Sequence, residues 1–166
     1  MKKILVCLLI GADLIGVSCA TTTSGGVATI EGEVTQQKVD TALNQIYDSL
    51  RPKLDLSGAR EYTVVRGDTL SAITRNHYGT LTGVGNAGPN NGFYFPVIMA
   101  ASGHQIVDPD LIEPGMKLMI PDLQRNLSNP IARKAIKDCL SDVAYVYNKK
   151  GVKVTEDGLT TLAASL

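Results

Sequence analysis

The chain has 166 residues, of which 44% are hydrophobic, and its 16 basic and 16 acidic side chains give a formal net charge of zero. This size and composition predict one compact domain with helical extensions, and exclude both wholesale disorder and two full domains. The neutral charge argues against a partner recruited through phosphate groups, so no nucleic acid is expected. Aromatic residues make up 5% and Trp is absent, which argues against a base-stacking platform or a Trp-lined sugar cleft.

The first 18 residues have the pattern of an export signal. Lys2 and Lys3 precede a short apolar run over 4–10, which is shorter than the ~20 residues that a membrane-spanning helix needs. The small residues at 16–18 and the following Cys19 resemble the cleavage site of a bacterial lipoprotein. This resemblance implies a lipoprotein-type signal peptide over 1–18. A simple cleaved signal and an uncleaved anchor are the alternatives.

The lipoprotein hypothesis has consequences for location and for disulfides. Lipid on Cys19 would anchor the protein in a membrane, because buried acyl chains contribute ~0.8 kcal/mol per methylene. The expected location is the cell envelope, facing the periplasm or the cell surface. Cys7 would leave with the signal peptide, so Cys139 would be the one remaining free thiol and no intramolecular disulfide is expected.

The mature chain is predicted to begin with a tether and a helix. Residues 19–34 lack helical periodicity and have the composition of a flexible tether. Residues 35–51 are predicted to be a helix that Thr35 caps and Pro52 ends. Its apolar side chains recur at helical spacing on one face: Val39, Leu43, Ile46 and Leu50.

A strand–helix–helix–strand unit is predicted over 61–121. Asp68 is expected to cap the first helix, and His77 is placed on the inner face of that helix. A loop rich in Gly and Asn, 79–92, separates the two helices. Pro96 stands in the first turn of the second helix and Gly103 at its left-handed end. The expected elements are a strand over 61–66, a helix over 69–77, a helix over 95–102 and a strand over 117–120.

Residues 129–166 are predicted to be a helical extension. Asn129 caps its first helix, Pro130 takes the first position, and Gly151 ends the helix. A short final helix is expected after Thr155. The flanking helices would pack together, pack on the central unit, or pair with a second copy of the chain. The inner face of the long helix is predicted from Ala132, Ile136, Cys139, Val143 and Val146.

Both ends of the central unit resemble the LysM family. Residues 62–73 contain a Tyr-Thr-Val strand and a Gly-Asp-Thr-Leu turn, and residues 108–121 contain a Pro-Gly turn and a second strand. The resemblance implies an α+β fold, a βααβ core with two helices on one face of a two-stranded antiparallel sheet, here with flanking α-helices. It also implies a ligand, namely peptidoglycan or another glycan that contains N-acetylglucosamine.

The resemblance places the glycan groove between two loops. An N-acetyl group needs backbone hydrogen-bond partners and a small apolar pocket, which loops of this composition supply. The alternative is that Asp68 and Thr69 only cap the helix while Leu70 and Ile112 belong to the core. The ten predicted site residues are Gly67, Asp68, Thr69, Leu70, Val107, Asp108, Pro109, Asp110, Leu111 and Ile112.

Catalysis and metal binding are not expected. Cys139 falls on an apolar helical stripe, which predicts a core thiol and not a nucleophile. A metal site built from His104, Asp108 and Asp110 is less plausible than a loop shaped by Asp-Pro-Asp. We therefore expect a binding protein without cofactor or metal that tethers the membrane to the cell wall. The alternative is an envelope scaffold whose LysM unit binds no glycan and whose flanking helices dock a protein partner.

Overall fold

The computed structural model of the protein describes residues 29–79, 89–103 and 108–166. The predicted signal peptide, the lipidation site Cys19 and most of the tether lie outside these residues. Val107, His104 and most of the loop between the two short helices also lie outside them. In the part of the chain that is described, no helix combines the length and the apolar character needed to cross a membrane.

The described residues contain a two-stranded antiparallel sheet of β1 (Arg60–Thr63) and β2 (Lys117–Ile120). Tyr62 lies opposite Leu118 in the register. The second strand is confirmed, whereas the first is shorter than the predicted 61–66. It ends early because a turn begins at Val65, whose carbonyl accepts a hydrogen bond from Asp68 N at 3.1 Å. Val65 is consequently 56% exposed and adds nothing to the core.

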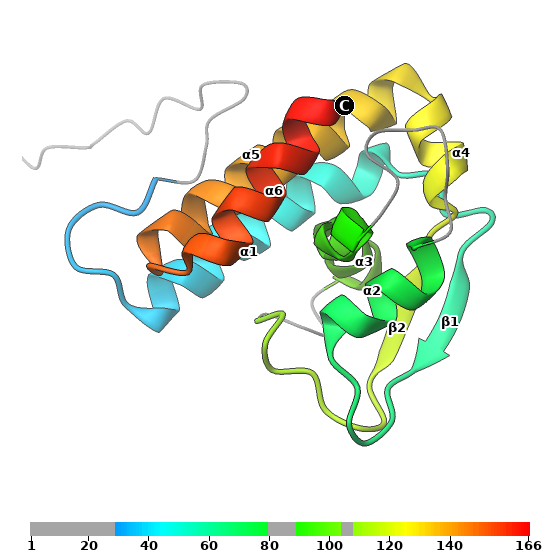
Figure 1. Ribbon diagram of the computed structural model, residues 1–166, viewed down its shortest axis with the longest axis horizontal. Helices are drawn as coiled ribbons and strands as arrows, with labels where there is room; N and C mark the ends of the chain where they lie inside the picture. Colours follow the sequence, from blue (N-terminus) through cyan, green and yellow to red (C-terminus); the bar gives the residue numbers. More distant parts are fainter. Residues whose placement is uncertain (1–28, 80–88, 104–107) are drawn as a thin grey trace, which may run out of the picture.

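Two short helices, α2 (Leu70–Tyr78) and α3 (Phe95–Ser102), cover one face of the sheet, and a 3-10 turn, η2 (Pro89–Tyr94), leads into α3 (Figure 1). The inner face of α2 differs from the prediction at its end. His77 is exposed, and Tyr78 is buried instead, with its hydroxyl donating to Pro121 O at 3.0 Å. Gly103 has the expected positive φ of 69°, but its ψ of −155° lies outside the left-handed helical region.

The flanking helices α1 (Gln36–Leu50), α5 (Pro130–Lys149) and α6 (Lys153–Ser165) pack side by side, and we call them the helical layer (Figure 1). The predicted caps of the first two are confirmed. The Thr35 hydroxyl accepts from Lys38 N at 3.4 Å, and the Asn129 side chain accepts from Ile131 N at 2.9 Å.

Two features of the carboxyl-terminal part differ from the prediction. A short helix, α4 (Leu123–Ser128), was not predicted, although Asp122 is an ordinary N-cap that accepts from Arg125 N at 3.0 Å. The last helix begins at Lys153 and not after Thr155. It starts early because Gly151, with φ of 74°, ends α5 in a tight turn that leaves only Val152 before α6.

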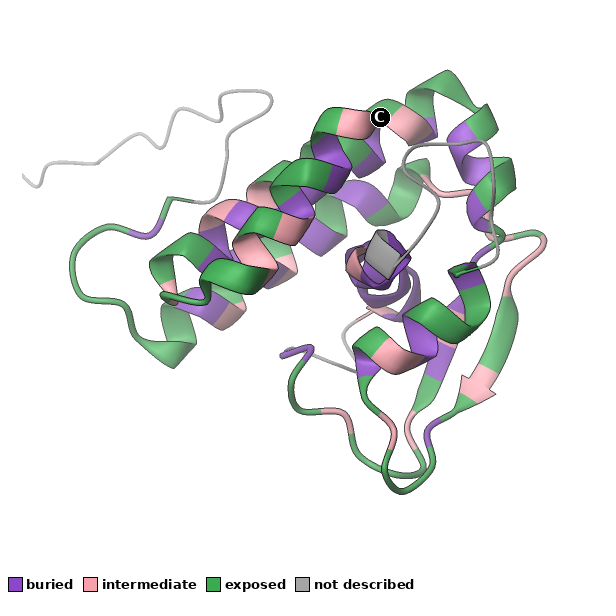
Figure 2. Cartoon of the chain, in the orientation of Figure 1, coloured by how far each residue is buried: buried purple, intermediate pink, exposed green. Residues whose placement is uncertain are grey.

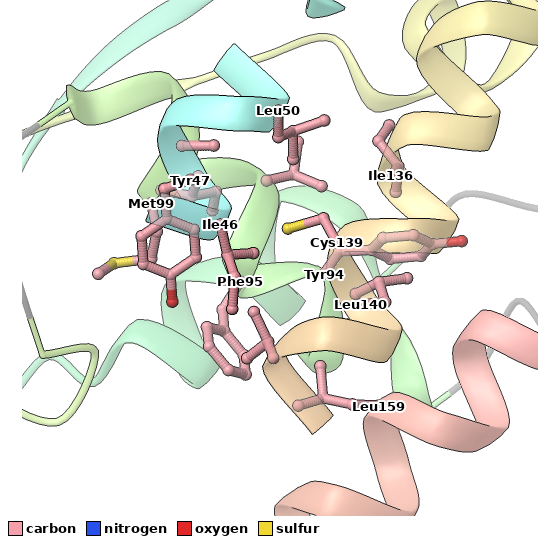
Figure 3. Close-up of a cluster of buried hydrophobic side chains, with 14 of the residues drawn as sticks. Ile46, Tyr47, Leu50, Tyr94, Phe95, Met99, Ile136, Cys139, Leu140 and Leu159 are labelled. Carbon is pink, nitrogen blue, oxygen red and sulfur yellow. The ribbon is translucent and has the colours of Figure 1, made fainter. Parts of the chain in front are cut away.

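Helix α3 lies between the sheet and the helical layer, and it carries the centre of the core. All eight of its residues are buried, because it contacts β2 on one side and α1 and α5 on the other (Figure 2). Figure 3 shows Tyr47 and Leu50 of α1 and Cys139 and Leu140 of α5 converging around the start of α3. The flanking helices therefore pack both together and on the central unit of their own chain, which are two of the three predicted arrangements.

Candidate functional site

The loop between β1 and α2 is held by Asp68. One oxygen of this carboxylate accepts from the hydroxyl of Tyr62 and from Val65 N, each at 2.9 Å. The hydrogen bond to Asp68 raises the pKa of Tyr62, because it is strongest while the phenol keeps its proton. The helix cap is Thr69, whose hydroxyl accepts from Ala72 N at 3.2 Å. The prediction that Asp68 caps the helix is thus wrong, because that carboxylate closes the preceding turn.

The loop before β2 is held by Asp108. Within the loop, this carboxylate accepts from Asp110 N at 2.9 Å, which is a common way for Asp to shape a turn. From the helical layer, Gln36 Nε2 donates to its other oxygen at 3.0 Å. Lys150 Nζ lies 3.8 Å from Asp108 and 3.5 Å from Asp110. The loop is therefore fixed by side chains that lie outside the βααβ unit.

A cavity of about 290 Å³ opens between these two loops, where the groove is predicted. Small-molecule sites start at roughly this size. Six of the ten predicted residues line it, three from each loop: Asp68, Thr69, Leu70, Pro109, Asp110 and Ile112.

The other four predicted residues are not among those that line the cavity. Gly67 is exposed with φ of 93°, so the turn itself calls for glycine there. Asp108 is only 9% exposed and is engaged as described, while Leu111 is 66% exposed at the surface. None of these three lines the cavity, and Val107 lies outside the described residues.

The cavity also has walls that sequence reasoning did not find. Ser71 and Arg75 of α2 line it, as do Gly92 and Phe93 of η2, Phe95 of α3, Tyr147 of α5 and Thr155 of α6. Both phenylalanines of the chain are in this set. Three of the eight aromatic residues of the chain therefore line the cavity, which the low aromatic content did not predict.

The chemistry of the lining suits a neutral, amphipathic ligand. Arg75 supplies guanidinium donors, the carboxylate of Asp110 accepts, and the hydroxyls of Thr69 and Ser71 do both. The aromatic rings offer apolar surface beside these polar groups. Such a mixture can hydrogen-bond an amide or a sugar hydroxyl while it covers a methyl group.

Cys139 is the one cysteine among the described residues, and it does not line this cavity. Cys139 is buried on α5, and burial, with smaller contributions from Asp142 and Asp138, raises the pKa of its thiol far above the usual value. The prediction of a core thiol is confirmed. Among the described residues, no cluster of three or more His, Cys, Asp or Glu side chains is arranged to hold a metal ion.

The βααβ unit, with its cavity between the β1–α2 loop and the loop before β2, has the arrangement that the sequence resemblance implies. Residues 62–121 match the family model described as LysM domain. This unit is a LysM domain. Domains of this family bind glycans that contain N-acetylglucosamine, and in general they are binding modules without catalytic activity.

The LysM domain covers about a third of the chain, from Tyr62 in β1 to Pro121 just after β2. The helical layer lies outside the match. Neither curated proteins nor solved structures match the chain significantly.

Proposed function

We propose that this protein binds peptidoglycan, or another N-acetylglucosamine polymer, in the cavity of its LysM domain and without catalysis. The observation that carries the proposal is the cavity itself, which lies between the two loops that a LysM groove uses and is lined by six of the residues predicted for it. The neutral chain matches a ligand that is recognised by hydrogen bonds and apolar contacts and not by net charge.

The absence of catalysis is part of the proposal. Helices α1 and α5 bury α3, and α6 packs on α5, so the helices outside the LysM domain add to one core. Cys139 is enclosed in that core. These observations favour a binding protein.

The location in the envelope is also part of the proposal. It is supported by the export-signal pattern and by Cys19, which follows the small residues at 16–18. A lipid on Cys19 and a glycan in the cavity would tether a membrane to the wall. Radioactive palmitate should label the protein in growing bacteria, and Cys19→Ala should remove the label while the protein is still made. Equal labelling of the Cys19→Ala variant would contradict lipidation at this residue.

The glycan-binding test is cosedimentation of the full chain, purified in mild detergent, with insoluble peptidoglycan. Ser71→Trp should place a large ring in the cavity and weaken binding about tenfold or more. Asn76→Trp is the matched control, because Asn76 is exposed on the same helix and does not line the cavity. Wild-type protein that is folded by circular dichroism but stays in the supernatant would overturn the proposal and favour a protein-docking scaffold.

A further inference from the structure

The cavity of the LysM domain has a wall that the domain does not supply. Tyr147 of α5 and Thr155 of α6 line it, although both lie beyond residue 121, where the domain ends. Figure 1 shows the helical layer running along one side of the LysM domain, next to the segment that enters β2. A ligand that lies between the two loops therefore meets the helical layer at one end.

This wall is tightly packed. Tyr147 is 2% exposed and packs edge to face against Phe95 with 6.0 Å between ring centroids. Phe93 lies directly against α6, since a Cβ atom added at Gly158 would stand 2.1 Å from its ring. Tyr147 and Phe95 are buried and Phe93 is partly buried, so opening the wall would expose a large apolar area.

The wall also contacts the loop before β2, through Lys150 at the end of α5. The ammonium group of Lys150 lies 4.9 Å from the centroid of the Tyr147 ring and 3.5 Å from the carboxylate of Asp110. Lys150 thereby joins the wall to the loop. The cavity volume of about 290 Å³ is at the lower end for ligand sites, which suits a short piece of a glycan.

We propose that the helical layer turns the groove of this LysM domain into a blind pocket that takes the terminal sugar of a glycan strand. The protein then binds strand ends and not strand interiors. This inference rests on the proposed glycan binding and adds the part of the glycan that is recognised. A strand has one end of each kind, so a blind pocket offers one binding register per strand whatever the strand length.

The first experiment compares ligand lengths and ligand ends by calorimetry with the full chain in mild detergent. The probes are the tetrasaccharide and the octasaccharide of β-1,4-linked N-acetylglucosamine. We expect the same Kd per molecule for both, within about twofold. A through-going groove would bind the octasaccharide several-fold more tightly, because a longer strand offers more registers.

End-modified octasaccharides complete that experiment. One is reduced with borohydride at its reducing end, and the other carries a β-linked galactose at its non-reducing end. One of the two changes should weaken binding by about tenfold or more, since only one kind of end enters the pocket. Undiminished binding of both modified sugars would overturn the inference and leave glycan binding intact. No binding of any sugar would overturn both proposals.

The second experiment tests the wall directly. Thr155→Trp places a ring in the pocket from α6, outside the LysM domain, and should weaken binding of the octasaccharide by about tenfold or more. Val154→Trp is the matched control, since Val154 is 79% exposed on the same helix and does not line the cavity. Both variants should melt like the wild type. Wild-type affinity in a folded Thr155→Trp protein would show that the helical layer takes no part in the site.

Discussion

Asn126 is the best-connected polar side chain of the core. It is 0% exposed, and its amide oxygen accepts from Asp55 N at 2.8 Å. Its amide nitrogen donates to Asp55 O at 3.0 Å and to Asp122 O at 2.8 Å. One residue of α4 thus holds the segment that leads into β1, and with it the start of the LysM domain.

Asn126→Ala should lower the free energy of unfolding by about 2–4 kcal/mol, because it leaves partly buried backbone groups of Asp55 without their side-chain partner. Urea unfolding followed by circular dichroism measures this change. Gln124→Ala, an exposed site on the same helix, should change stability by no more than about 0.5 kcal/mol. A loss below about 1 kcal/mol for Asn126→Ala would mean that water replaces the amide easily.

Asp55 makes folding sensitive to acid. Its carboxylate accepts from the hydroxyl of Ser57 at 2.6 Å and from Ser57 N at 2.9 Å, and these bonds, assisted by Arg125, lower the pKa of Asp55. A lowered pKa means that the charged form stabilises the fold above the ordinary pKa. This stabilisation is lost as the pH falls through the lowered value. Ser57→Ala should raise the pKa of Asp55, as measured by a carboxyl NMR titration. An unchanged titration would exclude Ser57 as the cause.

At the scale of secondary-structure elements, Lys150 connects the end of α5 with the loop before β2. Its side chain is 15% exposed, and it neutralises Asp108, which is nearly buried. Lys150→Met keeps the aliphatic stem beside Tyr147 but leaves Asp108 without its cation. We expect a stability loss of about 1–3 kcal/mol and weaker glycan binding as the loop loosens. Lys149→Met is the matched control, since Lys149 is exposed and lies over Tyr145. Equal effects of the two substitutions would contradict the role given to Lys150.

Gly158 sets the distance between α6 and η2. Alanine in an open helical position is favoured over glycine by ~1 kcal/mol, but here a Cβ atom would overlap the ring of Phe93. Gly158→Ala should therefore destabilise the protein by about 1–3 kcal/mol and displace Phe93 from the cavity. Thermal unfolding and oligosaccharide titration measure the two effects. Thr161→Ala, at an exposed site on α6, should have neither effect. A more stable Gly158→Ala protein would show that the contact with Phe93 is loose.

For the whole molecule, α3 makes the LysM domain depend on the helical layer. Val97, Ile98 and Met99 are each 0% exposed, and α3 packs against α1 and α5 as well as β2. Removing the layer would expose large apolar side chains that each contribute about 1.5–3 kcal/mol when buried. A fragment of residues 59–122 should therefore unfold without cooperativity or aggregate. Circular dichroism melting tests this, and a cooperative transition near that of the full chain would contradict it.

The LysM core could be predicted because its signals are local. Residues 62–73 carry a strand pattern, a turn and an amphipathic helix within one short stretch. The predicted N-cap of α2 was wrong because two neighbouring residues can both take that role. Asp68 and Thr69 can both cap a helix, and the choice of Thr69 depends on Tyr62, whose hydroxyl binds Asp68. The short α4 was overlooked because six residues are too few to show an apolar period.

The candidate site was predicted in part, because some of its residues lie in local motifs. The two loops at 67–70 and 107–112 were located from motifs that adjoin the strands, and six of their residues line the cavity. The aromatic wall was not predicted. Phe93 follows a stretch without periodicity, and Tyr147 lies on a helix where it looks like any other core residue.

By itself, the sequence determined the βααβ unit, most of the helices and the two loops of the groove, because turns, caps and periodic apolar stripes act within a few residues along the chain. Only the tertiary structure decided how the groove is completed. Tyr147 lies beside Phe95 because α5 packs on the buried α3, and Thr155 lines the cavity because α6 packs on α5 and η2. Packing of this kind brings together residues that are distant in the chain, and short sequence patterns do not predict it.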